Sequence, residues 1–107
     1  VYNIGYTSGI GSTVPANQLP DRFVLEQNYP NPFNPATVIR YSIPAPGHVT
    51  LSVYNVTGQK VATLVNEPRA AGTYEVTFNG DQLSGGIYFY RIKSGAFSQI
   101  RKMVLLK

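Results

Sequence analysis

The sequence contains no cysteine and no tryptophan, and only one histidine and five acidic residues among its 107 positions. Without cysteine, a disulfide scaffold, a thiolate zinc site and a cysteine nucleophile are excluded. The lack of tryptophan counts against a sugar-stacking platform. No stretch reaches the roughly 18 apolar residues that a membrane-spanning helix needs. Residues 1–10 have neither a basic start nor a long apolar run, so no signal peptide is expected there.

Few side chains are available for catalysis or for metal binding. The acids are dispersed along the chain, and no two of them lie at a spacing that forces them together. His48 stands at the entrance to an expected strand, without a second histidine or a cysteine to share a metal ion. Asn34, Asn79 and Asp81 offer loop oxygens for calcium, but the spacing of an EF-hand is absent. We therefore expect no catalytic residue, no metal and no cofactor.

The charge of the chain is basic but diffuse. Nine lysines and arginines give a net charge of +4 and a pI near 9.5. They are scattered, and only Arg101, Lys102 and Lys107 gather, near the end of the sequence. Because nucleic-acid binding needs clustered cations, it is not expected. Hydrophobic residues make up 43% of the chain, an ordinary share for a globular protein, so one domain with one core is expected.

The composition changes near residue 20. Residues 1–6 (VYNIGY) are consistent with the last strand of a preceding domain, and residues 7–20 (TSGIGSTVPANQLP) have the Gly- and Pro-rich composition of a flexible linker. We expect a single domain over residues 21–107. Seven short apolar or alternating runs follow, each bounded by turn residues, at residues 23–27, 37–43, 49–54, 60–65, 73–78, 87–93 and 96–106.

This pattern predicts an all-β antiparallel sandwich with essentially no helix, since no segment shows a 3.6-residue period. The alternation is clearest in residues 49–54, where Val49, Leu51 and Val53 are expected to face inward. Residues 87–93 (IYFYRIK) are apolar on both faces, so periodicity does not decide which face is buried. Tyr54, Tyr88 and Tyr90 are candidates for outward rings. The expected core consists of Ile39, Tyr41, Leu51, Val53, Leu64, Tyr74, Val76, Phe78, Ile87, Phe89 and Phe97.

Residues 28–35 (NYPNPFNP), which we call the proline loop, contain three prolines. Proline fixes its own φ and biases the preceding residue toward an extended conformation, so this segment is expected to be a rigid elbow. Phe33 is expected to plug one end of the sandwich. Residues 55–58 (NVTG) match a glycosylation acceptor pattern, but a hairpin turn explains them better, with Gly58 at a positive φ.

Three segments are distinctive: residues 25–35 (LEQNYPNPFNP), 51–65 (LSVYNVTGQKVATLV) and 85–107 (GGIYFYRIKSGAFSQIRKMVLLK). Together they resemble the type A C-terminal sorting domain (Por family) of bacterial type IX secretion cargo, from about Leu19 to Lys107. The resemblance implies a monomeric, non-enzymatic, seven-stranded immunoglobulin-like sandwich. Such a domain directs an N-terminally fused cargo from the periplasm through an outer-membrane translocon. A sortase-like protease at the cell surface then usually removes it, leaving the cargo secreted or on the cell surface.

Carried over residue by residue, the resemblance assigns sorting-signal recognition to residues 101–107, which we call the tail (Arg101, Lys102, Met103, Val104, Leu105, Leu106 and Lys107). Structural motif positions are Asn31, Pro32, Phe33, Asn34, Pro35, Gly58, Gly86 and Tyr88. The tail is open to two interpretations, a buried final strand or an edge strand that a receptor reads by strand addition. The alternative function is a carbohydrate-binding or assembly module, since residues 53–65 also resemble the immunoglobulin-like domain of flagellar hook-capping proteins.

Overall fold

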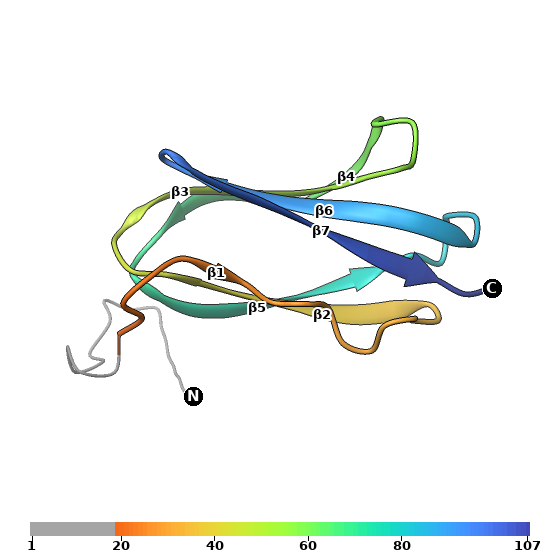
Figure 1. Ribbon diagram of the computed structural model, residues 1–107, viewed down its shortest axis with the longest axis horizontal. Coiled ribbons are helices and arrows are strands. Elements are labelled where there is room, and N and C mark those ends of the chain that lie inside the picture. Colours follow the sequence, from red (N-terminus) through yellow and green to blue (C-terminus); the bar gives the residue numbers. More distant parts are fainter. Residues whose placement is uncertain (1–18) are drawn as a thin grey trace.

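The computed structural model in Figure 1 describes residues 19–107. Within them lie the strands β1 (Val24–Leu25), β2 (Ala36–Ile43), β3 (Gly47–Tyr54), β4 (Lys60–Arg69), β5 (Gly72–Asn79), β6 (Gly86–Ser94) and β7 (Phe97–Leu105). This part of the chain contains no helix, and so no helix long and apolar enough to cross a membrane. The preceding-domain end and linker expected at residues 1–20 lie outside the described residues, apart from Leu19 and Pro20.

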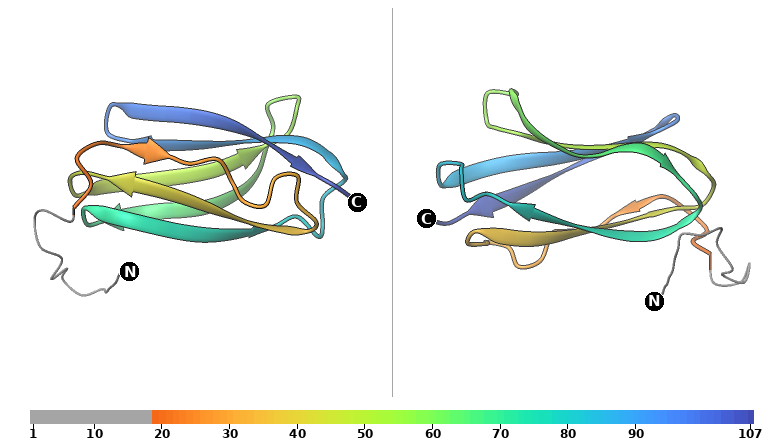
Figure 2. Two further views of the ribbon diagram at one scale, coloured as in Figure 1. Left: turned by 60° about the horizontal axis from the view of Figure 1, so that its bottom comes forward. Right: turned by 180° about the vertical axis from the view of Figure 1, so that it is seen from behind.

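The seven strands form two antiparallel sheets that stack face to face (Figures 1 and 2). One sheet has the order β1-β2-β5, and the other has the order β4-β3-β6-β7. The chain changes sheets after β2, β4 and β5. At the start of β6 the Tyr88 hydroxyl donates a hydrogen bond to the Ser84 carbonyl at 2.7 Å. Such a tyrosine corner is a feature of immunoglobulin-like sandwiches, and the expected fold is confirmed.

The core lies between the sheets and follows the period-two alternation of the strands. Val49, Leu51 and Val53 on β3 are fully buried, as the alternation predicted. Of the other expected core residues, Ile39, Tyr41 and Phe78 are buried, whereas Leu64, Tyr74, Val76 and Phe97 are partly buried against the same cluster.

The expectation that Ile87 and Phe89 of β6 belong to the core is wrong. Ile87 is 41% exposed, and Phe89 is half-buried on the outer side of the sheet, whereas Tyr88 and Tyr90 are buried in the core. The register explains this, because Tyr90 pairs with Val53 of β3 and cross-strand partners share a face. A sugar platform of Tyr54, Tyr88 and Tyr90 is therefore ruled out.

Several strand limits also differ from expectation. β4 continues to Arg69 through the segment expected to be a loop, with Pro68 opposite His48. Proline is tolerated there because β4 is at the edge of its sheet and needs no second hydrogen-bonded neighbour. β1 is shorter than the run at residues 23–27, and the turn between β6 and β7 consists of Gly95 and Ala96 instead of the expected Ser94 and Gly95, because Ser94 still belongs to β6. Gly58 has a φ of 87°, as the turn pattern predicted.

Candidate functional site

The tail belongs largely to β7, whose side chains alternate between two environments. Met103 and Leu105 point into the core and are 0% and 1% exposed. Lys102 and Leu106 are exposed on the other face of the strand, with half-buried Val104 between them. The tail predicted as one recognition segment is thus divided by the pleat into a buried row and an outward row.

The outer backbone edge of β7 is occupied by the proline loop. The Phe33 amide donates to the Val104 carbonyl at 2.9 Å, and the Leu106 amide donates to the Phe33 carbonyl at 2.8 Å. Phe33 thereby forms a parallel bridge with Leu105. The Val104 amide donates to Asn31 Oδ1 at 3.0 Å. Between Val104 and Leu106 the backbone groups that an added strand would need are therefore already bonded.

Internal hydrogen bonds hold the proline loop against the core. Its first residue, Asn28, is buried, and its amide donates to the Tyr90 hydroxyl at 2.8 Å. That hydroxyl in turn donates to the Glu26 carbonyl at 2.6 Å. The Asn28 side chain donates to Thr37 Oγ1 at 3.0 Å and to the Pro30 carbonyl at 3.1 Å. These bonds tie the loop to β6 and β2 before it reaches the edge of β7.

Phe33 fills the end of the sandwich, as expected from the sequence. The side chain is 1% exposed and meets Phe78 edge-to-face, with ring centroids 6.0 Å apart. A Cβ placed on Gly80 would lie 2.9 Å from Leu105 Cδ2 and 3.6 Å from the Phe33 ring, so a side chain at this position would require Leu105 to shift. The proline loop, the end of β5 and the tail therefore pack as one unit. The peptide bonds before Pro30, Pro32 and Pro35 are cis.

The cations of the tail differ in their surroundings. Arg101 Nε donates to the Leu25 carbonyl at 2.5 Å, which ties β7 to β1 across the sheets. Lys107 Nζ donates to the Asp81 carbonyl at 2.7 Å. Lys102 has no ion-pair partner among residues 19–107. Of these three side chains, Lys102 is the one free to meet a partner.

Three other motif positions, Pro35, Gly86 and Gly58, lie at backbone contacts or turns. Pro35 accepts a hydrogen bond from the Gly80 amide at 2.8 Å, and Gly86 begins β6 opposite Leu105. At the turn before Gly58, Asn55 Oδ1 accepts bonds from the Thr57 and Gln59 amides at 3.1 and 3.0 Å, which supports the turn interpretation of this segment.

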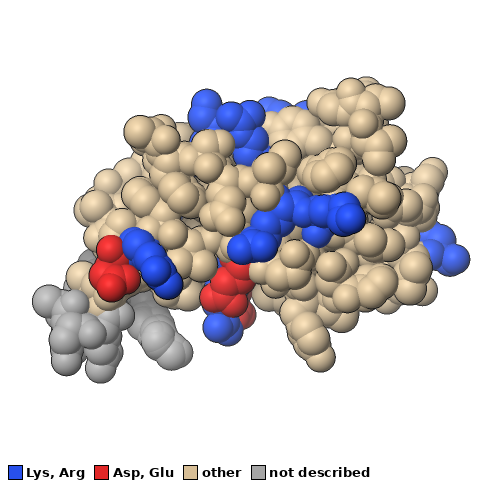
Figure 3. Space-filling model, in the orientation of Figure 1, with Lys and Arg blue, Asp and Glu red and all other residues tan. Residues whose placement is uncertain are grey.

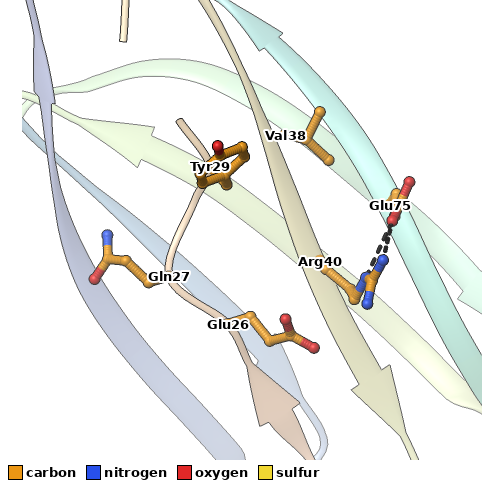
Figure 4. Close-up of a pocket in the computed structure, with 6 residues that line it drawn as sticks. All are labelled: Glu26, Gln27, Tyr29, Val38, Arg40 and Glu75. Carbon is orange, nitrogen blue, oxygen red and sulfur yellow. Dashed lines mark hydrogen bonds and ion pairs between the residues drawn. The ribbon is translucent and has the colours of Figure 1, made fainter. Parts of the chain in front are cut away.

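A shallow groove beside the proline loop contains polar groups, of which Arg40 and Glu75 form an ion pair (Figure 4). Arg40 Nε and Nη2 both reach Glu75 Oε2, at 3.0 and 2.6 Å. This hydrogen bond and the charge of Glu75 raise the pKa of Arg40. The remaining lining residues are Glu26, Gln27, Tyr29 and Val38.

No metal cluster accompanies this groove. Residues 19–107 contain no group of three or more His, Asp or Glu side chains placed to hold a metal. His48 Nε2 lies 2.7 Å from Asn66 Oδ1 on the surface, away from any acid partner. Of the loop oxygens considered for calcium, Asn79 Oδ1 accepts a bond from the Asp81 amide at 2.8 Å.

The fold is a seven-stranded β-sandwich whose last strand is bonded to the proline loop at Asn31 and Phe33, a contact that we call the clasp. Residues 27–106 match the family described as the secretion system C-terminal sorting domain, and the chain belongs to this family. No curated protein matches the sequence. The domain is thus a C-terminal sorting signal for type IX secretion, and the carbohydrate-binding and hook-capping alternatives are not favoured. This function implies contact with the secretion machinery, an N-terminal cargo, and export to the cell surface or beyond. Sorting domains of this family are not known to have enzymatic activity.

Proposed function

We propose that the secretion machinery reads the outward side chains of the tail while the tail is part of the folded sandwich. Lys102, Val104 and Leu106 form the outward row, and the backbone from Val104 to Leu106 is bonded to the proline loop. A receptor that meets this end of β7 therefore finds side chains rather than free donors and acceptors. This single observation favours side-chain recognition over strand addition.

The two rows of the tail then have different roles in the proposal. Met103 and Leu105 anchor the strand in the core, and Arg101 fixes it to β1. Lys102, Val104 and Leu106 provide the contacts, while Lys107 is held to the Asp81 carbonyl. The unit of sorting is the monomeric domain of residues 21–107. Cargo crosses from the periplasm through an outer-membrane translocon, and a sortase-like surface protease cuts within residues 8–20, whose Gly- and Pro-rich composition suits cleavage.

The test is export of the parent protein in a host that has the type IX system. The variant Lys102→Glu/Leu106→Ser changes two exposed side chains and leaves the buried row intact. We expect cargo to accumulate in the periplasm, as we also expect when residues 101–107 are deleted, while the far-ultraviolet circular dichroism of the double variant stays that of the wild type.

A matched control is Arg22→Glu/Val56→Ser, which makes the same chemical changes at exposed positions outside the tail. It should be exported normally. Normal export of both the tail double variant and the deletion would overturn the proposal. Loss of export in the control as well as in the variant would show a general sensitivity to charge, and would also count against it.

A further inference from the structure

The pairing of β4, β3, β6 and β7 brings together side chains that are distant in the sequence. Lys102 pairs with Phe89, which pairs with Tyr54 on β3, and Tyr54 pairs with Lys60 on β4. Because cross-strand partners share a face, these four side chains form one row across the side of the sheet that faces away from the core. We call this side the outer face. Two parallel rows are Thr63, Ser52, Arg91 and Ile100, and then Asn66, Thr50, Lys93 and Ser98.

The outer face carries cations without acids. Lys60, Arg91, Lys93 and Lys102 belong to it, and none of them has an ion-pair partner among residues 19–107. Glu67 lies on β4 but pairs with buried Val49, and therefore belongs to the opposite side of the sheet.

The other acids lie away from this face as well. Glu75 is bound to Arg40 on the three-stranded sheet, and Asp21, Glu26 and Asp81 lie outside the strands. In the view of Figure 3, basic side chains on the upper side, over the four-stranded sheet, have no acidic neighbour, whereas the visible acidic side chains below lie beside basic ones. The unpaired cations are thus on the four-stranded sheet, and the charged pair Arg40–Glu75 is on the three-stranded sheet.

Apolar side chains lie between these cations. Ile87 and Ile100 are 41% and 56% exposed, and Leu106 at the end of the tail is 52% exposed. Half-buried Phe89 and Val104 connect them, since Ile87 pairs with Val104 and Phe89 with Lys102. Aromatic and arginine side chains are enriched at protein interfaces, which have an apolar core and a polar rim.

We infer that the outer face docks onto an acidic protein surface of the secretion machinery. This inference rests on the proposed function and extends the recognition surface from the tail across β6, β3 and β4. The unpaired cations specify a partner with carboxylates. A protein fits better than a lipid headgroup layer, because the apolar side chains alternate with cations in the same rows, as Phe89 does with Lys102, and do not form the separate apolar face that a membrane anchor requires.

The test variant is Lys60→Glu/Lys93→Glu, which reverses two exposed charges of the outer face without touching the tail. The control is Arg22→Glu/Thr77→Glu/Gln82→Glu, which changes the net charge by the same amount at exposed positions elsewhere. Because like charges placed opposite one another are strongly repulsive, we expect surface export of the parent protein to fall about tenfold or more in the test variant, and to be unchanged in the control.

Binding of the purified chain to two kinds of vesicle identifies the partner class. Outer-membrane vesicles from the host should bind the wild type in a salt-sensitive manner, and the test variant about tenfold more weakly. Protein-free vesicles made from the extracted lipids of the same membrane should bind neither. Equal binding to the lipid vesicles would overturn the choice of a protein partner.

The outcomes separate this inference from the proposed function. Normal export of Lys60→Glu/Lys93→Glu together with failure of Lys102→Glu/Leu106→Ser would overturn the wider face and leave the tail signal standing. Normal export of both double variants would overturn the proposed tail signal as well as the wider outer face.

Discussion

The Tyr90 hydroxyl links the core to the proline loop through hydrogen bonds. The substitution Tyr90→Phe removes only this hydroxyl group. The ring is 0% exposed, and the hydroxyl both accepts from the Asn28 amide and donates to the Glu26 carbonyl, at 2.8 and 2.6 Å. Phenylalanine keeps the ring and its packing. The variant therefore leaves a buried amide without its acceptor and a carbonyl without its donor, with little change in volume.

The size of the effect follows from those two groups. Asn28 is 2% exposed, so its orphaned amide costs about 1–3 kcal/mol, and the lost bond to Glu26 adds about 1 kcal/mol. We expect the free energy of unfolding to fall by about 2–4 kcal/mol, which lowers the Tm of a domain of this size by at least about 8 °C.

Tyr88→Phe is the matched control on the same strand. The Tyr88 hydroxyl donates to the carbonyl of Ser84, an exposed residue whose carbonyl can turn to water after the change. Tyr88→Phe should therefore lower the free energy of unfolding by about 1 kcal/mol or less.

The assay is urea unfolding of the 107-residue chain followed by circular dichroism. The wild type, Tyr90→Phe and Tyr88→Phe should show similar slopes, with a lower midpoint for Tyr90→Phe. If the urea midpoint of Tyr90→Phe equals that of the wild type, or lies above that of Tyr88→Phe, then the two bonds of the Tyr90 hydroxyl do not hold the proline loop against the core, and this explanation is wrong.

The remaining predictions concern alkaline stability and the edge of β7. Burial raises the pKa of Tyr41, Tyr74 and Tyr90 above 10.0, the ordinary value for tyrosine, so above that pH the unfolded chain binds fewer protons than the folded one and stability falls as pH rises. Urea midpoints should drop from about pH 9 to pH 11, less steeply in Tyr90→Phe, and a flat profile would contradict the shift. Separately, Asn31→Ala removes the acceptor of the Val104 amide, and hydrogen exchange of that amide should quicken about five- to tenfold. An unchanged rate at Val104 would show that this bond does not protect the edge.

The strands that could be predicted from the sequence are those whose two faces differ in polarity. In β3, apolar Val49, Leu51 and Val53 alternate with polar partners, so the pattern itself identifies the buried side. β6 offers apolar residues to both sides, and its inner face is decided by pairing with β3. Pairing partners are set by tertiary structure, so Tyr90 and Phe89 could not be told apart from periodicity.

The candidate site was only partly accessible to sequence reasoning for the same reason. The cations of the outer face are scattered along the chain, at Lys60, Arg91, Lys93 and Lys102, and they gather only through the registers of β4, β6 and β7. The clasp likewise joins Asn31 to Val104, which are 73 positions apart. The one local signal was the proline loop itself, whose prolines predicted a rigid segment but not the strand that it covers.

The clasp also bears on how the signal differs between folded and unfolded chains. In an unfolded chain the tail is a short flexible peptide, and all of its side chains are available. In the folded domain Lys102, Val104 and Leu106 are held on one side about 6.6–6.8 Å apart, with Lys102 and Val104 beside Phe89 and Ile87 of β6, and the cations Arg91 and Lys93 follow on the same side of that strand. Docking through the outer face therefore requires β4, β3, β6 and β7 to be assembled. A receptor that binds this arrangement selects domains that have already folded, because the unfolded tail offers neither the spacing nor the neighbouring charges.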